Sequence, residues 1–242
     1  MGSVRAGAGD RPGIAVGAAD GLLPVVQRTG GQNATAFVHG YLKELILDLV
    51  VQPKTLITEM DVARATGLSR TPIREAFLRL HEERLVEIFP RRGALVSPIT
   101  ARQVRELYEV RFLLEFHAAE VICTERLSAA DTLTPLCTEQ ATLYAEGALP
   151  PALIRVDRQF HSELIAAAGN TVMSTVNDSL GDHHQRTGVL SFSLDRRRCE
   201  MAVEQHLEIT AALAGFDLKR ARRAIERHLV IGQRELEKLL RN

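Results

Sequence analysis

Residues 67–77 read Gly-Leu-Ser-Arg-Thr-Pro-Ile-Arg-Glu-Ala-Phe, and this stretch decides the fold of the N-terminal part of the chain. Gly67 is suited to end a helix, because glycine readily adopts the positive φ that helix C-termini favour. Thr71 can cap a new helix a few residues later, and Pro72 suits its first position. Apolar residues then recur at helical spacing, at Ile73, Phe77 and Leu80. The stretch therefore predicts the turn and the second helix of a helix-turn-helix.

The residues before this stretch predict two more helices. Apolar residues recur at helical spacing from Thr35, so we expect a first helix that runs to about Val51. Thr58 and Asp61 have the spacing of a capping box, in which each side chain satisfies a backbone N–H of the first turn. They open a short second helix that ends at Gly67.

Two short β-rich runs follow the helix-turn-helix, at Leu85–Phe89 and Ala94–Ser97. The turn between them carries Arg91, Arg92 and Gly93, and the glycine can supply a positive φ. Helix, turn, helix and hairpin together predict a winged helix-turn-helix domain over residues 36–98.

The remaining residues, 99–242, have a helical apolar period throughout. We expect six helices, at about 101–126, 129–147, 151–168, 171–190, 195–214 and 217–240, packed as an all-α antiparallel bundle. Residues 1–35 are glycine-rich and lack periodicity, which predicts a flexible tail. The fold class is therefore mainly α, with an N-terminal winged helix-turn-helix followed by a helical bundle.

Composition sets outer limits on the function. The 242 residues include 30 Lys and Arg against 30 Asp and Glu, so net charge does not favour nucleic acid, and a DNA-binding function has to rest on where the cations lie. No stretch approaches the roughly 18 apolar residues of a membrane helix, and no signal-peptide core follows the N-terminus. We expect a cytoplasmic protein with no membrane partner.

Cations are placed where a helix-turn-helix would need them. The second helix of this motif enters the major groove with its N-terminal residues at the base edges. Arg70 and Arg74 lie at that end, and an Arg fork matches guanine or phosphate. The hydroxyls of Ser69 and Thr71 suit phosphate contacts, and the wing adds two further cations. The alternative is that these arginines belong only to a solvated surface.

Residues 36–100 resemble the DNA-binding domain of GntR-family transcriptional regulators. The resemblance is carried by Ser69–Glu75, which reads Ser-Arg-Thr-Pro-Ile-Arg-Glu, and by the wing turn Pro90–Gly93. It implies that Arg70, Thr71 and Arg74 contact double-stranded operator DNA and that Gly93 approaches the DNA backbone. The chain departs from the family at Gln52-Pro53-Lys54, where a glycine-bearing turn is usual, and at Arg84, where a glycine is usual.

Four residues of the helical part share a geometric explanation. Asp157 and His161 are four apart on one expected helix, hence on one face. His206 and His228 lie at similar distances on either side of the turn near Gly215, so an antiparallel helix pair would bring them to one height. Three histidines and a carboxylate suit zinc, nickel or a similar divalent ion with open positions. The alternative, a satisfied core or surface residue, holds for any one histidine alone, and we assign it to His39, His81, His117 and the pair His183-His184.

Residues 101–242 resemble the effector domain of the FadR-type (FCD) branch of this family. The matching segments are Leu107–Arg111, Asp157–His161, His206 and His228. The resemblance implies a divalent metal held by Asp157 and the three histidines, with a small organic acid completing the coordination. Six helices would favour the shorter subgroup of the branch. Arg111 is a candidate anchor for the effector carboxylate, with an ion pair to Glu115 as the alternative.

The preferred function is a homodimeric DNA-binding transcriptional regulator, with repression as the expected sign, controlled by the effector near the metal. Two alternatives use the same Asp/His site. One is a metal-dependent hydrolase with Glu163 as its base, and the other is a direct metal sensor.

Overall fold

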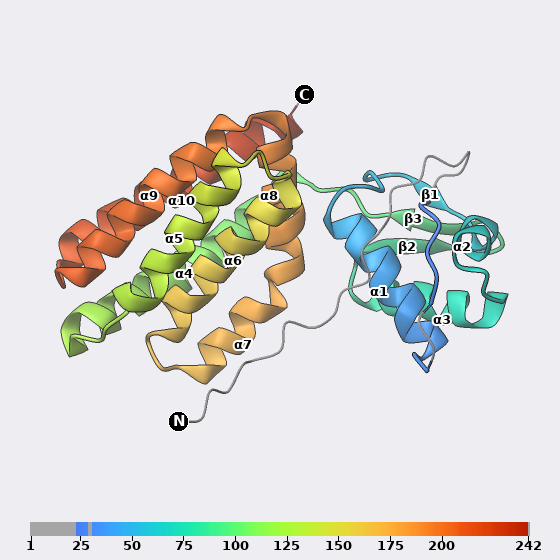
Figure 1. The fold of residues 1–242 in the computed structure, drawn as a ribbon, viewed down its shortest axis with the longest axis horizontal. Coiled ribbons are helices and arrows are strands. Elements are labelled where there is room, and N and C mark those ends of the chain that lie inside the picture. The colour runs from blue at the N-terminus through green and yellow to red at the C-terminus, as the bar shows by residue number, and fades with distance from the viewer. Residues whose placement is uncertain (1–22, 29–30, 242) are drawn as a thin grey trace. The chain divides into compact units, whose positions relative to one another are not determined.

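The computed structural model describes residues 23–28 and 31–241, and these contain ten helices and three strands. The chain divides into two compact units (Figure 1). Among the described residues, the first contains those up to Glu44 together with Lys54–Ser97, and the second contains Leu45–Pro53 and those from Pro98 onward. No helix within the described ranges is long and apolar enough to cross a membrane.

The first unit is a winged helix-turn-helix. Its elements are α1 (Ala34–Leu47), β1 (Leu56–Ile57), α2 (Glu59–Thr66), α3 (Arg70–Glu82), β2 (Val86–Phe89) and β3 (Gly93–Val96). The strands form an antiparallel sheet in the order β1-β3-β2, with Val86 opposite Val96 and Phe89 opposite Gly93. The capping box at Thr58 and Asp61 is present, and Gly67 ends α2 with a φ of 69°.

Two boundaries differ from expectation. Helix α1 ends at Leu47 and not near Val51, because Leu49 adopts a φ of 55° and turns the chain. Helix α3 begins at Arg70 with Ser69 at the N-cap, so Thr71 lies inside the first turn and does not cap the helix. Pro72 is therefore its third residue and not its first. Since proline has no N–H, one of the two donors that the Ser69 side chain could accept is missing, and Ser69 makes no side-chain capping bond.

The turns of this unit explain the departures from the family pattern. Lys54 and Arg84 have φ values of 67° and 60°, which lie in the left-handed region that glycine occupies without strain. Gly93 is constrained more strongly, with a φ of 127°, and a Cβ there would lie 2.2 Å from the carbonyl oxygen of Ile57. At Lys54 and Arg84, where the family usually has a glycine-bearing turn or a glycine, this chain therefore adopts a backbone conformation that suits glycine.

The second unit is an all-α bundle. Its helices are α4 (Ala101–Glu125), α5 (Ala130–Ala145), α6 (Pro150–Ala166), α7 (Thr171–Ser179), α8 (Gly181–Leu194), α9 (Arg197–Ala214) and α10 (Leu218–Leu240). The expected helix 171–190 is two helices, so the described bundle has seven and the count of six is wrong. The shorter subgroup, which was inferred from that count, loses its basis. The break falls at Leu180, next to Gly181, where a Cβ would lie 2.3 Å from the Arg158 guanidinium.

The core of the bundle lies between α4, α5, α6, α9 and α10, which run alongside one another in Figure 1. Helices α9 and α10 form a hairpin, and α10 also packs on α4. The fully buried apolar side chains include Phe160, Leu164, Ile209, Ile225 and Leu229. Because Phe160 and Leu229 are sequence neighbours of the predicted ligands His161 and His228, the packing of the core also sets the directions of those ligands.

The expected tail, residues 1–35, falls mostly on residues 1–22 and 29–30, outside the described residues. The adjoining residues are part of the first unit, contrary to expectation. The side chain of Leu23 is buried, and the N–H of Val26 donates to the Ala65 carbonyl at 2.9 Å. The Tyr41 hydroxyl donates to the carbonyl of Pro24. One buried apolar side chain and two hydrogen bonds made by its backbone therefore anchor this segment, although the segment has no apolar periodicity.

Candidate functional sites

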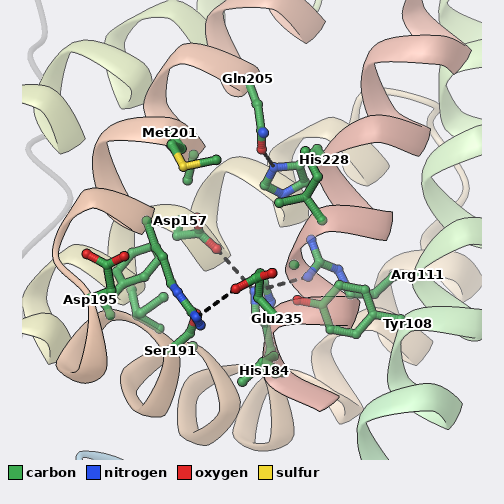
Figure 2. A pocket seen from close by; sticks show the side chains of 18 residues that line it. Tyr108, Arg111, Asp157, His184, Ser191, Asp195, Met201, Gln205, His228 and Glu235 are labelled. Atoms are coloured by element: carbon green, nitrogen blue, oxygen red, sulfur yellow. Dashed lines mark hydrogen bonds and ion pairs between the residues drawn. The ribbon is translucent and has the colours of Figure 1, made fainter. Parts of the chain in front are cut away.

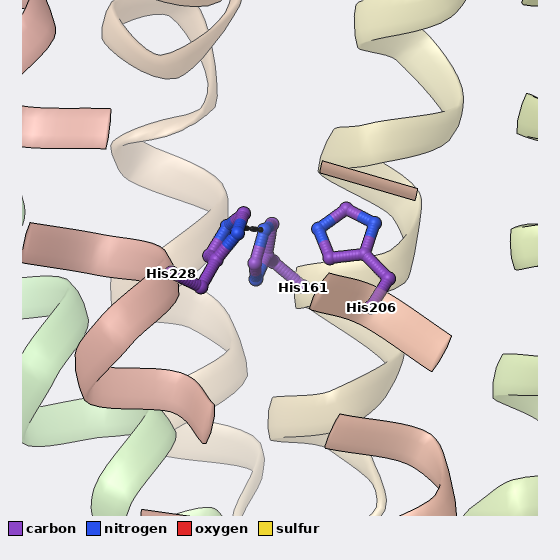
Figure 3. A group of neighbouring side chains, drawn as sticks. All are labelled: His161, His206 and His228. Atoms are coloured by element: carbon purple, nitrogen blue, oxygen red, sulfur yellow. Dashed lines mark hydrogen bonds between the residues drawn. The ribbon is translucent and has the colours of Figure 1, made fainter. Parts of the chain in front are cut away.

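The three predicted histidines meet inside the bundle (Figure 3). His161 is on α6, His206 on α9 and His228 on α10. Their ring centroids lie 5.0 Å apart for His161 with each of the others, and 4.8 Å apart for His206 with His228. Asp157 lies one turn before His161, with its carboxylate oxygens 3.6 Å from Nε2 of His206 and 3.9 Å from Nε2 of His161. The structure thus brings all four predicted ligands together.

Outer hydrogen bonds orient each imidazole. The Nδ1 atom of His161 lies 3.1 Å from Glu115, that of His206 lies 3.1 Å from Oε1 of Gln140, and that of His228 lies 2.9 Å from Oε1 of Gln205. Because each partner atom is an acceptor, each Nδ1 carries the proton and donates it. The three Nε2 atoms then carry no proton, and each has an available lone pair. The sequence alone did not single out Gln140 or Gln205, which lie on α5 and α9.

The bare nitrogens have no donor to satisfy them. Nε2 of His161 and Nε2 of His228 face each other at 3.2 Å, and Nε2 of His206 is buried without a hydrogen-bond partner among the described residues. Lone pairs that converge in a buried space repel one another unless a cation lies between them. The donor set, three imidazole nitrogens beside a carboxylate, therefore fits a divalent transition-metal ion.

Burial keeps these ligands in the protonation states that metals bind. It lowers the pKa of His161, His206 and His228, and the nearby charge of Arg111 lowers these values further, so the rings are neutral near pH 7. Burial would raise the pKa of Asp157, but the hydrogen bond from His184 and the neighbouring histidines outweigh it and hold that pKa well below the usual value. The cluster is therefore three neutral donors and one anion.

His184 belongs to this site, although its pairing with His183 suggested a structural residue. Its Nε2 lies 3.1 Å from Oδ2 of Asp157 and 3.4 Å from Nη1 of Arg111. A single ring nitrogen cannot donate to a carboxylate and accept from a guanidinium at once, so the two neighbours compete for it. Burial lowers the pKa of His184 to about 4. The sequence did not reveal its role because the helix break at Leu180, which sets the face of α8, was not foreseen.

Arg111 forms the ion pair that was expected as the alternative, and its role as an effector anchor stays a prediction. Its Nε donates to Glu115 at 3.0 Å, as the ion-pair alternative required, and the residue is only 3% exposed. Its Nη2, however, has no hydrogen-bond partner within the described residues. Guanidinium groups pair bidentately with carboxylates, so one arm of Arg111 remains available to a ligand.

A cavity of about 380 Å³ adjoins the cluster (Figure 2). It is bounded by α4, α6, α8, α9 and α10, and its lining includes Arg111, Asp157, His184 and His228. This volume lies in the range of small-molecule sites. Glu163 is two residues from His161 and so points to another face of α6, and it does not line the cavity.

The predicted DNA-reading residues lie on the first unit. Arg70 and Arg74 are 79% and 63% exposed, and both approach Glu59 of α2, at 4.0 Å and 2.6 Å. Glu75, which follows Arg74 on α3, accepts a hydrogen bond from the Thr35 hydroxyl at 2.6 Å. In the wing turn, the exposed Arg91 adopts a φ of 64° and is followed by the exposed Arg92. Recognition helix and wing thus present cations to solvent.

Two family models match the chain. The one described as bacterial regulatory proteins, gntR family, covers residues 34–96, and the FCD domain covers residues 106–230. The chain belongs to the GntR family of transcriptional regulators, in its FCD branch. The first match contains every predicted DNA-contacting residue, and the second contains Arg111 and the Asp/His cluster.

This GntR-family regulator resembles several curated proteins. It is 28% identical to the HTH-type transcriptional repressor RspR of Escherichia coli strain K12, over 79% of this chain and 84% of the relative. It is 27% identical to the uncharacterized regulator YdhC of Bacillus subtilis, over 71% and 76%. These relatives are transcriptional regulators and not enzymes, so the hydrolase alternative is set aside.

Solved structures show the same fold. The regulator aligns with a putative GntR regulator from Rhodococcus sp. RHA1 at a TM-score of 0.69 and 23% identity, over 84% of this chain and 96% of the other. It aligns with E. coli McbR/YncC at a TM-score of 0.68 and 19% identity, over 86% and 99%. The winged helix-turn-helix and helical bundle are therefore a shared architecture of this family.

Proposed function

We propose that this GntR-family regulator is a cytoplasmic homodimeric repressor that releases operator DNA when it binds a small carboxylate. Arg70, Arg74 and the hydroxyls of Ser69 and Thr71 would contact one half-site through the major groove and its phosphates. The wing, with Arg91, Arg92 and Gly93, would contact the adjacent backbone. Two protomers would then read a palindrome with half-sites about one helical turn apart.

The effector site is the Asp/His cluster with a bound divalent ion. Asp157, His161, His206 and His228 would hold zinc or nickel, which would supply a Lewis-acidic position for one carboxylate oxygen. The free arm of Arg111 would take the carboxylate as a second anchor. The observation that carries this proposal is the convergence of three Nε2 atoms: those of His161 and His228 face each other at 3.2 Å, and that of His206 is buried with no hydrogen-bond partner among the described residues.

The control of DNA binding by the effector follows from the linkage between the two binding equilibria. An effector changes DNA affinity only to the extent that it binds the two protein states unequally, and the coupling is typically 5- to 150-fold. The sign is proposed from the relative RspR, whose name states that it is a repressor. Asp157 and His184 offer a local switch. When the Asp157 carboxylate binds the metal, it no longer takes the hydrogen bond from His184, and Nε2 of His184 can accept a hydrogen bond from Arg111 instead.

Operator titration at fixed metal tests this proposal. DNA duplexes would be selected by the protein from a random library and titrated by fluorescence anisotropy with saturating zinc, with and without acetate, lactate or citrate. We expect a carboxylate to weaken DNA binding at least fivefold in the wild type and to have no effect in Arg111→Met. If zinc addition or removal alone controlled DNA binding and no carboxylate mattered, the protein would be a metal sensor instead.

A further inference from the structure

The cavity beside the histidine cluster extends well beyond the space that a metal-bound carboxylate needs. Two polar contacts connect α9 with α10 along it. His228 donates to Gln205 at 2.9 Å, and Arg198 donates to Glu235 at 3.0 Å. On each helix the two contacting residues are seven positions apart. At a rise of 1.5 Å per residue, the two contacts are therefore about 10 Å apart along the hairpin. The cavity lining includes all four residues.

The wall between these two contacts is apolar. It is formed by Met201 and Ala202 of α9, Ile231 and Gly232 of α10, Ile154 of α6 and Phe192 of α8. Gly232 leaves room for the Tyr108 ring, since a Cβ there would lie 2.7 Å from the Tyr108 hydroxyl. A ligand in this region would contact hydrocarbon and aromatic surface almost throughout.

The two ends of the cavity differ in charge. At the cluster end, the free arm of Arg111 and the metal ion of the proposed function favour an anion. At the far end, Arg198 is already satisfied by Glu235 and by the Ser191 hydroxyl at 3.1 Å. Asp195 adds a second carboxylate there. Lys238 also pairs with Glu235, at 2.6 Å, but its side chain is 72% exposed and does not line the cavity, so within the lining two anions face one cation. A second carboxylate on the ligand would be repelled at this end.

We infer that the effector is a monocarboxylate with an apolar body, alkyl or aryl, about 10 Å long. This inference rests on the proposed function, because the carboxylate is placed at the metal and Arg111. A two- to four-carbon hydroxy acid would leave the apolar wall uncovered, and a long dicarboxylate would meet Glu235 and Asp195. The apolar length of the ligand therefore provides the selectivity.

Isothermal titration of the zinc-loaded full-length protein with straight-chain acids from acetate to dodecanoate tests the length. We expect the Kd to fall about fourfold per methylene between butanoate and octanoate. The gain should stop once the chain exceeds the cavity. Octanedioate should bind at least tenfold more weakly than octanoate. A Kd independent of chain length, or a preference for citrate or octanedioate, would overturn the inference.

Two variants locate the effect in the cavity. Ala202→Phe fills the apolar wall. It should weaken octanoate binding at least tenfold while leaving acetate binding and zinc content unchanged. Ala211→Phe, at an exposed position on the same helix, should change none of these three quantities. Glu235→Gln frees Arg198 and should reverse the preference toward octanedioate. Glu226→Gln, on the exposed face of α10, is its control. An octanoate Kd unaltered by Ala202→Phe, together with an unaltered preference in Glu235→Gln, would overturn the inference.

The outcomes separate this inference from the proposed function. If zinc is held and acetate binds but chain length has no effect, the inference fails and the proposed function stands. If zinc is not held but octanoate still binds with the fourfold increments, the inference stands and the metal role fails. If zinc is held and no acid of any length binds, both the inference and the carboxylate part of the proposed function fail.

Discussion

The recognition helix and the histidine cluster differ in how the chain builds them. The proposed DNA-reading residues Arg70 and Arg74 lie within one contiguous stretch, are exposed, and approach Glu59 on the neighbouring helix. The proposed metal ligands lie on three helices, are buried or nearly so, and receive their orientation from acceptors on α4, α5 and α9. A surface that binds a large partner can be encoded locally, whereas a buried site requires long-range packing.

The difference predicts which region is sensitive to single substitutions. An exposed ion pair contributes little, because water screens it. A buried charge left without its partner is costly, because neither water nor protein compensates it. Four substitutions, taken from the largest expected effect to the smallest, test this contrast.

Glu115→Leu should have the largest effect on stability. It leaves Arg111 buried without its ion-pair partner and removes the acceptor of His161, so we expect a loss of about 3–5 kcal/mol in the free energy of unfolding. The double variant Arg111→Met/Glu115→Leu should recover much of this loss. Glu106→Leu breaks an exposed pair of the same spacing on the same helix and should cause no measurable loss in urea titrations. Equal losses for the buried and exposed pairs would contradict the contrast.

The pH dependence of the metal-free protein should include a contribution from His184, beside those of the other three buried histidines, whose pKa values burial also lowers. The pKa of His184 is about 4 in the folded protein against an ordinary value of 6.5, so the unfolded chain binds a proton first as the pH falls. Stability from this group is therefore complete above pH 6.5 and decreases below it, by about 2 kcal/mol at pH 5. His184→Gln keeps a donor for Asp157 but does not titrate, so its unfolding free energy should decrease less between pH 7 and pH 5. An identical decrease in the variant would refute this assignment.

Arg74→Ala should affect DNA binding and not folding. Loss of a bidentate base contact should weaken binding to the selected duplex about 5- to 150-fold and relax sequence preference at one position. The urea midpoint should not change, because the side chain is exposed. Arg79→Ala, at an exposed position in the last turn of the same helix, is the matched control. Anisotropy titrations showing equal effects of both variants would place the reading residues elsewhere.

Arg84→Gly should have the smallest effect and the opposite sign. Arg84 is exposed and holds a φ of 60°, so glycine relieves backbone strain and should stabilise the protein by about 0.5–1 kcal/mol. Arg79→Gly, in the last turn of α3, should instead destabilise by up to about 1 kcal/mol. Thermal unfolding of the two variants compares them directly, and destabilisation by Arg84→Gly would show that its side chain matters more than its backbone.

The same contrast explains how much the sequence predicted. The winged helix-turn-helix followed from local signals such as the capping box at Thr58 and the glycine at position 67, which act within one turn of a helix. The four metal ligands could be proposed from helical spacing and from symmetry about the turn near Gly215. The predictions that failed depended on details of the backbone. Thr71 was predicted as the N-cap of α3, and the break at Leu180 between α7 and α8 was not predicted.

His184 shows why such details matter for function. Its role depends on the direction of α8, which the Leu180 break sets, and on contacts with Asp157 and Arg111 from two other helices. No spacing rule connects residue 184 with residues 111 and 157. Gln140 and Gln205 were missed for the same reason, because a glutamine acquires its role only when packing places its amide beside an imidazole.

The metal content of protein purified without an affinity tag or chelator tests the central claim most directly. Elemental analysis should find about one divalent ion per chain in the wild type and in His39→Ala, whose imidazole pairs with Glu83 in the first unit. His206→Ala removes one of the three converging Nε2 donors and should lose the ion. A wild type that is empty and cannot be reconstituted with zinc or nickel would contradict the account.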